Sequence, residues 1–158
     1  MEIPTDAVNY GPYGSSKETN WSVELGRCEY IKEVLVNHGW IVDGIGFVIA
    51  DASGLPCPAK WFGGRGGDAS RITMRSNEYI TRISGKYGRY AHARSEITIG
   101  SLRIHTNLWP SGYGPYGEVK LVDNIQSFST PLQTSDTVVK LYGTYHAYLG
   151  SIGIHVRK

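Results

Sequence analysis

The sequence predicts an all-β protein built from three similar units. The first observation is composition, because the 158 residues include 20 Gly, 11 Tyr and 4 Trp but only 2 Met, a profile of short strands and turns. The second is a period-two alternation of apolar and polar residues in many short runs, with no window that favours a helix. The third is self-similarity at a spacing of about 50 residues. A chain of this length predicts one domain with a core of its own.

The first unit follows a loose N-terminus. Residues 1–9 are polar and without pattern, so we expect a flexible end that leads into a turn at residues 10–14, and a single domain over residues 10–158. Residues 30–38 are rich in Ile, Val and Leu, and residues 45–49 alternate, so the two runs predict a hairpin. The loop between them contains Gly39, Trp40, Ile41, Val42 and Asp43.

The rest of the chain repeats this pattern of strand, loop and strand. A glycine cluster at residues 63–67 follows the short run 59–62. Further strands are expected at residues 71–75, 79–85, 96–99, 102–106, 126–129, 138–143 and 151–156. Turns rich in glycine and aromatic residues precede the units at 11–14, 61–64 and 114–117. Because one unit cannot bury a face alone, the three should pack around a shared core.

Composition and charge exclude several partners. Lys and Arg number 16 against 14 Asp and Glu, and no basic run exceeds two residues, so we expect no nucleic-acid partner. No apolar run reaches the length of a membrane span and no signal peptide is seen, which predicts a cytoplasmic protein, with the nucleus as the alternative. Cys28 and Cys57 are expected to be reduced, and a disulfide between them stays open as the alternative.

Motifs for catalysis and for metal binding are missing from the sequence. The five His residues are scattered, and none has a zinc-ligand spacing with Cys, Asp or Glu. No nucleophile elbow or supported Cys and His pair occurs. Asp43 and Asp68 could mimic a glycosidase pair, but their glycine-rich setting offers no apolar pocket to raise a carboxyl pKa. We therefore expect no enzyme and no cofactor.

The loop 39–43 and the glycine cluster 63–67 form the candidate binding site. A carboxylate beside free backbone N–H groups suits a neutral polyhydroxylated ligand. The hydroxyls of such a ligand donate hydrogen bonds to the carboxylate and accept them from the N–H groups. Glycines let the main chain approach closely. The alternative is a plain turn in which Asp43 bonds its own backbone. Trp40 either covers a sugar ring or packs at the edge of the neighbouring hairpin.

Nearly the whole chain resembles the jacalin-related lectins, specifically the uncleaved mannose-binding type. Each matching motif is weak alone, but their order is specific. The motifs are Gly11-Pro12-Tyr13-Gly14, the Gly-x-x-x-Asp loop 39–43, the cluster 63–67, and residues 83–88, 113–117, 127–129 and 149–153. The resemblance implies a β-prism of three four-stranded antiparallel Greek-key sheets with pseudo-threefold symmetry, sugar binding without metal, and no catalysis. Since family members are often dimers, a homodimer is an open expectation.

The resemblance also implies that the family's principal sugar loop is degenerate here. That loop closes the third repeat with its own Gly-x-x-x-Asp, against a glycine-rich opening turn. His146 stands at the glycine position and Gly150 at the carboxylate position, with Ala147 and Tyr148 between them. The opening turn at residues 14–18 has lost its glycines after the first. A missing charged acceptor costs typically 1.5–3 kcal/mol per hydrogen bond, or roughly tenfold to a hundredfold in affinity.

A second site known in some relatives remains intact at the first-repeat loop, whereas the middle repeat, residues 91–96, has no such motif. By position, Asp43 would accept from sugar hydroxyls, and the N–H groups of Trp40, Ile41 and Gly67 would donate. The expected site residues are Gly39, Trp40, Ile41, Val42, Asp43, Gly66 and Gly67. The expected ligands are mannose- or glucose-type glycans. The alternative is an interaction or defence-associated scaffold that has lost sugar binding.

Overall fold

The computed structural model describes residues 7–131 and 137–157, and the regular secondary structure in this part of the chain is almost entirely β-strand. The strands are β1 (Ala7–Gly14), β2 (Trp21–Glu24), β3 (Tyr30–His38), β4 (Val42–Ala50), β5 (Lys60–Gly63), β6 (Asp68–Thr73), β7 (Ile80–Tyr90), β8 (Glu96–Thr106), β9 (Tyr113–Tyr116), β10 (Val122–Ser129), β11 (Thr137–Gly143) and β12 (Ser151–Arg157). One short 3₁₀ turn, η1 (Ala91–Ala93), joins β7 to β8. The expected all-β class is confirmed.

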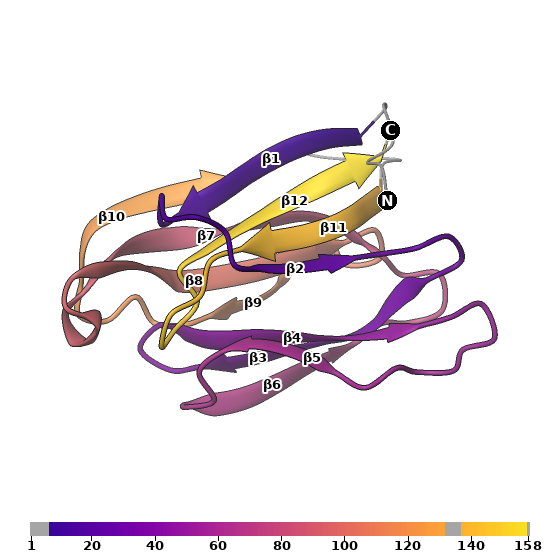
Figure 1. Ribbon diagram of the computed structural model, residues 1–158, viewed down its shortest axis with the longest axis horizontal. Coiled ribbons are helices and arrows are strands. Elements are labelled where there is room, and N and C mark those ends of the chain that lie inside the picture. The colour runs from indigo at the N-terminus through magenta and orange to yellow at the C-terminus, as the bar shows by residue number, and fades with distance from the viewer. Residues whose placement is uncertain (1–6, 132–136, 158) are drawn as a thin grey trace.

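The strands form three four-stranded antiparallel sheets, in the orders β1-β12-β11-β2, β10-β7-β8-β9 and β5-β4-β3-β6 (Figure 1). Each sheet is centred on one hairpin: β3–β4, β7–β8 or β11–β12. The next two strands along the chain flank each of the first two hairpins, whereas β1 and β2 from the other end flank the third. This arrangement confirms the three repeated units and the prism.

The inward faces of the three sheets meet in one core. Alternation places every second side chain of a strand on the same face, so each hairpin contributes a row of apolar residues. The fully buried members include Val34, Phe47, Ile83, Leu102, Ile104, Leu141 and Ile154. Burial of one such side chain is worth about 1.5–3 kcal/mol, so three hydrophobic faces hold the prism closed.

Several expected boundaries were wrong. Strand β1 begins at Ala7, so residues 7–9 of the expected loose terminus lie in a sheet, and residues 1–6 lie outside the described residues. The expected turns at 10–14 and 113–117 belong to β1 and β9. Both are edge strands, where Gly and Pro are tolerated because only one neighbour needs hydrogen bonds.

The remaining differences between the expected and observed elements concern one strand that continues across an expected gap and two elements that were not expected. Residues 96–106 form the single strand β8, because Ser101 continues the pairing with β7 across the expected gap. The short strand β2 was not expected, and η1 is a helical turn where none was predicted. None of the described helices is long and apolar enough to cross a membrane.

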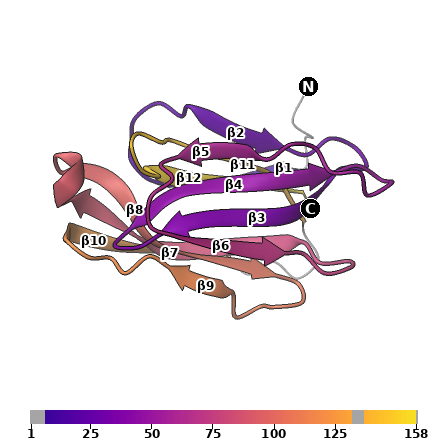
Figure 2. The same ribbon diagram turned by 90° about the horizontal axis from the view of Figure 1, so that it is seen from below.

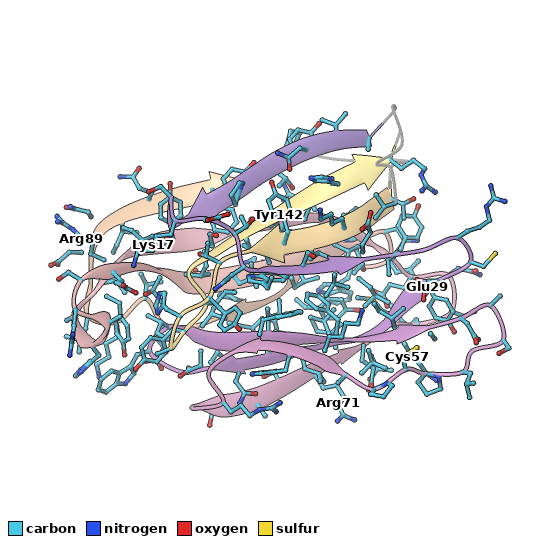
Figure 3. All side chains as sticks on the ribbon, in the orientation of Figure 1. Lys17, Glu29, Cys57, Arg71, Arg89 and Tyr142 are labelled. Carbon is cyan, nitrogen blue, oxygen red and sulfur yellow. The ribbon has the colours of Figure 1, made fainter. Side chains whose placement is uncertain are left out.

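Two ends of the prism differ in character. The loops between β3 and β4, β5 and β6, β7 and β8, and β11 and β12 gather at one end, on the left in Figure 1, and Figure 2 shows the same grouping. The opposite end carries Cys57 and Glu29 (Figure 3). Cys28 and Cys57 are both exposed and unpaired. The loop-rich end therefore holds the expected site.

Candidate functional site

The expected loop 39–43 comprises the β3–β4 loop at residues 39–41 and the first two residues of β4, Val42 and Asp43, and this segment is held by its carbonyl groups. All five residues from Gly39 to Asp43 use their carbonyl oxygen as an acceptor. The donors are the N–H groups of Glu118 to Gly39, Lys120 to Trp40, Gly39 to Ile41, Leu149 to Val42 and Gly64 to Asp43, at 2.8–3.2 Å. Three of these donors come from distant parts of the chain. The loop conformation is therefore fixed by tertiary contacts.

Fewer of the backbone N–H groups than of the carbonyl groups in this segment have a hydrogen-bond partner in the described protein. Within the described ranges, neither the Trp40 nor the Ile41 N–H donates to any protein acceptor. Backbone donors without a protein partner are normally satisfied by water or by a ligand. The backbone carbonyl groups of this segment are thus hydrogen-bonded within the protein, whereas the N–H groups of Trp40 and Ile41 are available to a ligand.

The glycine cluster lies against the Asp43 carboxylate. A Cβ added at Gly66 would lie 3.0 Å from Oδ2 of Asp43, and one added at Gly67 would lie 3.1 Å from Oδ1. At Gly67 it would also meet the carbonyl oxygen of His38 at 2.3 Å, and the φ of +75° favours glycine independently. Only residues without a side chain leave room for both backbone and carboxylate here.

Side chains from two strands hold the glycine cluster in this position. The Asn37 side-chain amide donates to the Arg65 carbonyl at 2.8 Å, and the Trp61 indole N–H donates to the Gly63 carbonyl at 3.1 Å. The Arg65 guanidinium lies over the Trp61 ring at 4.7 Å. The second loop is consequently anchored to the sheet that carries the first.

A depression of about 250 Å³ opens between the two loops. Its lining residues are Gly39, Trp40, Ile41, Asp43, Gly67, Tyr90 and Tyr148. Five of these were expected from the sequence, and the two tyrosines were not assigned to it. Their rings pack edge to face with centroids 5.2 Å apart. Tyr90 ends β7 and Tyr148 lies before β12, so each of the three repeats contributes to this wall.

Partial burial changes the pKa of the Asp43 carboxyl group. Burial raises its pKa above the ordinary value of 3.8, against smaller lowering effects from His38 and from the backbone N–H of Asp43 itself. The expectation that this setting would not raise a carboxyl pKa was therefore wrong, because the packed loops partly bury the carboxyl group. Burial likewise raises the pKa of Tyr90, helped by the nearby charges of Tyr148 and Asp43. Asp68 is not among the groups that change the pKa of Asp43.

Trp40 packs at the edge of the neighbouring hairpin. The residue is 42% exposed, with the Lys120 ammonium 4.7 Å from the centroid of its ring and the His92 ring 5.4 Å away. These two neighbours hold the indole at the rim of the depression. The Val42 side chain, by contrast, is fully buried in the core and does not line the depression.

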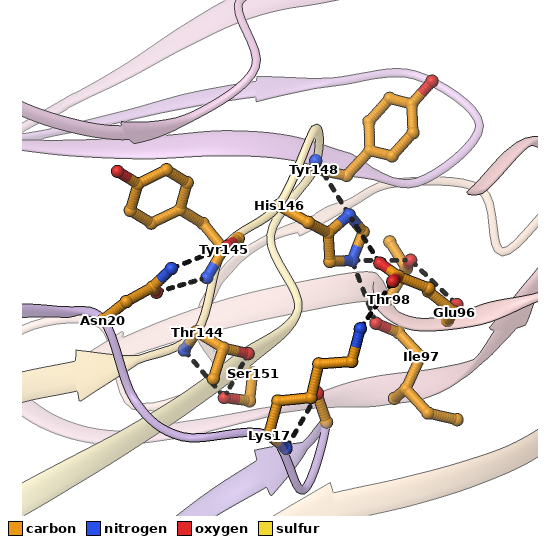
Figure 4. Close-up of polar contacts among 11 residues, drawn as sticks. Lys17, Asn20, Glu96, Ile97, Thr98, Thr144, Tyr145, His146, Tyr148 and Ser151 are labelled. Atoms are coloured by element: carbon orange, nitrogen blue, oxygen red, sulfur yellow. Dashed lines mark hydrogen bonds and ion pairs between the residues drawn. The ribbon is translucent and has the colours of Figure 1, made fainter. Parts of the chain in front are cut away.

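The third-repeat loop, residues 144–150, is filled by the protein's own side chains (Figure 4). His146 Nε2 lies 3.1 Å from the Ile97 carbonyl oxygen, and His146 Nδ1 accepts from the Tyr148 N–H at 3.3 Å. Lys17, from the opening turn, forms an ion pair with Glu96 at 2.5 Å. Glu96 also lies 3.6 Å from His146 Nδ1. The polar groups of this loop bond one another.

The Gly150 position leaves little space for a carboxylate. Its carbonyl accepts from the Ser15 N–H at 2.9 Å, which ties it to the opening turn. A Cβ at Gly150 would lie 2.6 Å from Thr144 Oγ1 and 3.3 Å from the His146 ring. The carbonyl oxygen of Ala147 would lie 2.5 Å from a Cβ at Gly64. The third-repeat loop thus packs directly against the glycine cluster of the first site.

Comparison with known protein families gives one match across most of the chain. A model of the Jacalin-like lectin domain matches residues 10–155. A mannose/glucose-specific lectin of Parkia platycephala is 33% identical over 156 residues, which is 96% of this chain. The chain spans only 32% of that relative's own length.

Solved structures share the fold. The agglutinin of Calystegia sepium matches with a TM-score of 0.79 at 24% identity, covering 99% of each chain. A mannose-binding lectin from champedak matches with a TM-score of 0.77 at 20% identity, covering 99% of this chain and 100% of the other. At these identities the likeness establishes the three-sheet architecture.

Proposed function

The chain belongs to the jacalin-like lectin domain family, a family of carbohydrate-binding proteins that are not enzymes, and on that premise we propose that it binds mannose- or glucose-type glycans in the depression beside Asp43. The observation that carries this proposal is the position of the Asp43 carboxylate opposite the glycine cluster. The relative from Parkia platycephala is named as mannose/glucose-specific, which supports the choice of sugar.

The chemistry of the depression fits one sugar ring. Two vicinal hydroxyls donate to the Asp43 carboxylate, and the N–H groups of Trp40 and Ile41 donate to sugar oxygens. Hydrogen bonds to a charged group contribute about 1.5–3 kcal/mol each. The apolar faces of Tyr90 and Tyr148 provide a wall for the carbon skeleton of the sugar.

Titration of mannose oligosaccharides into matched variants tests this proposal. In Asp43→Asn the side chain keeps its size but loses the charged acceptor, so we expect affinity to fall at least about tenfold. The control is Asp68→Asn, an exposed acidic residue at the start of the neighbouring strand β6. Equal affinity in the wild type and in Asp43→Asn would refute the assignment, whatever the control does.

A second candidate function is a scaffold that binds a protein and no sugar. The filled third-repeat loop favours it, because His146 bonds the Ile97 carbonyl and the Tyr148 N–H there, and Lys17 pairs with Glu96 beside it. A broad glycan screen distinguishes the two candidates. A silent screen together with a reproducible protein partner supports the scaffold, and a specific glycan that competes with mannose excludes it.

A homodimer is proposed as the means of raising weak single-site affinity. Two linked sites bind a branched glycan with an effective concentration that replaces free diffusion for the second contact. Light scattering at several protein concentrations measures the oligomeric state. If the protein is monomeric at all concentrations, a homodimer cannot raise its affinity. The proposal of a single sugar site beside Asp43 would not be affected.

A further inference from the structure

The outer face of the second sheet, β10-β7-β8-β9, gathers positive charge that the linear sequence separates. Alternation on β7 puts Ile83 in the core and Arg82, Ser84 and Lys86 on the opposite face. Strand β8 places Arg103 opposite Ser84. No basic run reveals this grouping, because each cation is separated from the next by one or more residues of other types or lies on another strand.

The three cations form a triangle around Ser84. Strand geometry puts the Arg82 and Lys86 α-carbons about 13 Å apart, with Arg103 beside the midpoint on the adjacent strand. Arg82 bonds the Ser129 hydroxyl at 3.0 Å and Arg103 bonds the Gly114 carbonyl at 3.2 Å. Within the described residues, none of the three forms an ion pair with a carboxylate. No ion pair therefore neutralises these charges, but Arg82 has a buried Nε and lies outside the groove described next, which leaves Lys86 and Arg103 as the cations available to a ligand there.

A groove of about 510 Å³ runs across this face. Its polar lining includes Lys86, Arg103, Ser101 and Ser127, with Glu118 as the one carboxylate among the described lining residues. Serine hydroxyls beside cations donate to oxyanions without adding charge. The groove is separate from the Asp43 depression, with which it shares no lining residue.

The His105 side chain, which lies beneath this face, is neutral. Its Nδ1 lies 2.7 Å from the Pro110 carbonyl oxygen, which can only accept, so the Ser84 hydroxyl donates to Nε2 at 2.7 Å. Burial lowers the pKa of His105, and this effect, with smaller ones from the charges of Arg82 and Arg103, outweighs the hydrogen bond to the Pro110 carbonyl, which raises it. The positive charge of the face therefore comes from the arginines and the lysine.

We propose that this groove binds a sulfated polysaccharide, by contact of its sulfate groups with the two cations that line it, Lys86 and Arg103. Lys86 and Arg103 come from the adjacent strands β7 and β8, so sulfates repeated along a linear chain can contact both. A nucleic acid fits less well, because the one aromatic side chain among the described lining residues, Phe128, is only 7% exposed and offers no stacking platform. This site does not depend on the sugar site at Asp43.

The test measures binding of a heparin octasaccharide to the full chain at 50 and 150 mM salt. The double variant Lys86→Gln and Arg103→Gln is expected to lose at least about tenfold in affinity. The matched control is Arg27→Gln and Lys60→Gln, which removes the same charge from exposed positions outside the groove and is expected to change affinity less than about twofold. Wild-type affinity should weaken at the higher salt concentration.

Three outcomes would overturn the proposal. They are no octasaccharide binding at 50 mM salt, an equal loss in the control double variant, and tighter binding of a single-stranded DNA of matched charge. If the double variant unfolds, the single variant Lys86→Gln replaces it, because this exposed side chain makes no hydrogen bond or ion pair in the described structure. Reduced octasaccharide binding by Lys86→Gln with an unchanged melting temperature supports the site, and unchanged binding refutes it.

Discussion

A methyl group added at Gly66 would stand 3.0 Å from Oδ2 of Asp43, so the glycine cluster and the carboxylate of the first-repeat loop face each other across one narrow gap. Asp43 lies at the start of β4 and Gly66 lies in the loop between β5 and β6, so both belong to the sheet β5-β4-β3-β6. Their proximity means that the position of the carboxylate depends on a residue with no side chain of its own.

Gly66→Ala is expected to weaken mannose binding about tenfold with little loss of stability. The new methyl group would displace the Asp43 carboxylate from its position, and the φ of Gly66 is not in the region that only glycine favours. Calorimetric titration and thermal unfolding measure the two effects. The control is Gly54→Ala, whose Cβ would meet only the Tyr30 hydroxyl at 3.6 Å, although a φ of +82° strains it. The control should lose stability and keep affinity, and the reverse pattern would contradict the prediction.

Sugar affinity is expected to fall with decreasing pH from a higher pH than an ordinary aspartate would give. Burial raises the pKa of Asp43 above 3.8, and protonation removes the charged acceptor. Titrations from pH 7 down to pH 4 should show the fall in the wild type. Asp43→Asn should bind weakly with no comparable pH dependence. A wild-type affinity that stays constant across this range would count against a role for the carboxylate.

The same raised pKa predicts the sign of a stability effect. Between pH 3.8 and the folded-state pKa of Asp43, the native state holds a proton that the unfolded state has lost, so stability falls as pH rises through this interval. Ionised Asp43 therefore costs stability at neutral pH. Asp43→Asn is expected to be at least as stable as the wild type at pH 7, as measured by denaturant unfolding. A clear destabilisation would show that the carboxylate makes stabilising contacts in the folded state.

Glu78 is expected to stabilise the fold at neutral pH and to lose this contribution in acid. Burial alone would raise its pKa, but hydrogen bonds from the Arg75 backbone, Thr106, Tyr113 and the Arg75 side chain outweigh it and lower the pKa from 4.5 to about 2. The shift corresponds to about 3 kcal/mol that is present above pH 4.5 and is lost as the pH falls towards 2.

Unfolding of Glu78→Gln measures this contribution. The variant should be destabilised at pH 7 by an amount of that order, and the difference from the wild type should shrink between pH 4.5 and 2. Glu18→Gln, at an exposed carboxylate, serves as the control and should change little. A constant difference between Glu78→Gln and the wild type across this range would point to packing instead of charge.

Gly150→Asp alone is expected not to create a second sugar site. Its Cβ would lie 2.6 Å from Thr144 Oγ1, His146 would still bond the Ile97 carbonyl and the Tyr148 N–H, and Lys17 would still pair with Glu96. Titration should give the same stoichiometry of mannose binding as the wild type, with a lower melting temperature. A doubled stoichiometry would show that the missing carboxylate was the only defect of that loop.

The sequence predicted the hairpins well because their signals are local. Residues 30–38 coincide with β3, and the alternating run 45–49 lies within β4. Alternation depends only on neighbouring residues, so it can be read without knowing the fold. The edge strands β1 and β9 were read as turns, because Gly and Pro carry the same local signal in a turn and at a sheet edge. The ladder partners that distinguish the two cases lie far away in the sequence.

The sequence by itself determined the three repeats, the presence of a Gly-x-x-x-Asp motif at residues 39–43, and its absence at residues 146–150. Tertiary structure alone decided that Tyr148 of the third repeat lines the depression of the first, and that Tyr90 joins it from the second. It also decided the raised pKa of Asp43 and the gathering of cations on the second sheet. Residue types and spacings are properties of one segment. Burial, close approach and shared faces arise only when the three hairpins pack together, because each depends on atoms that distant segments supply.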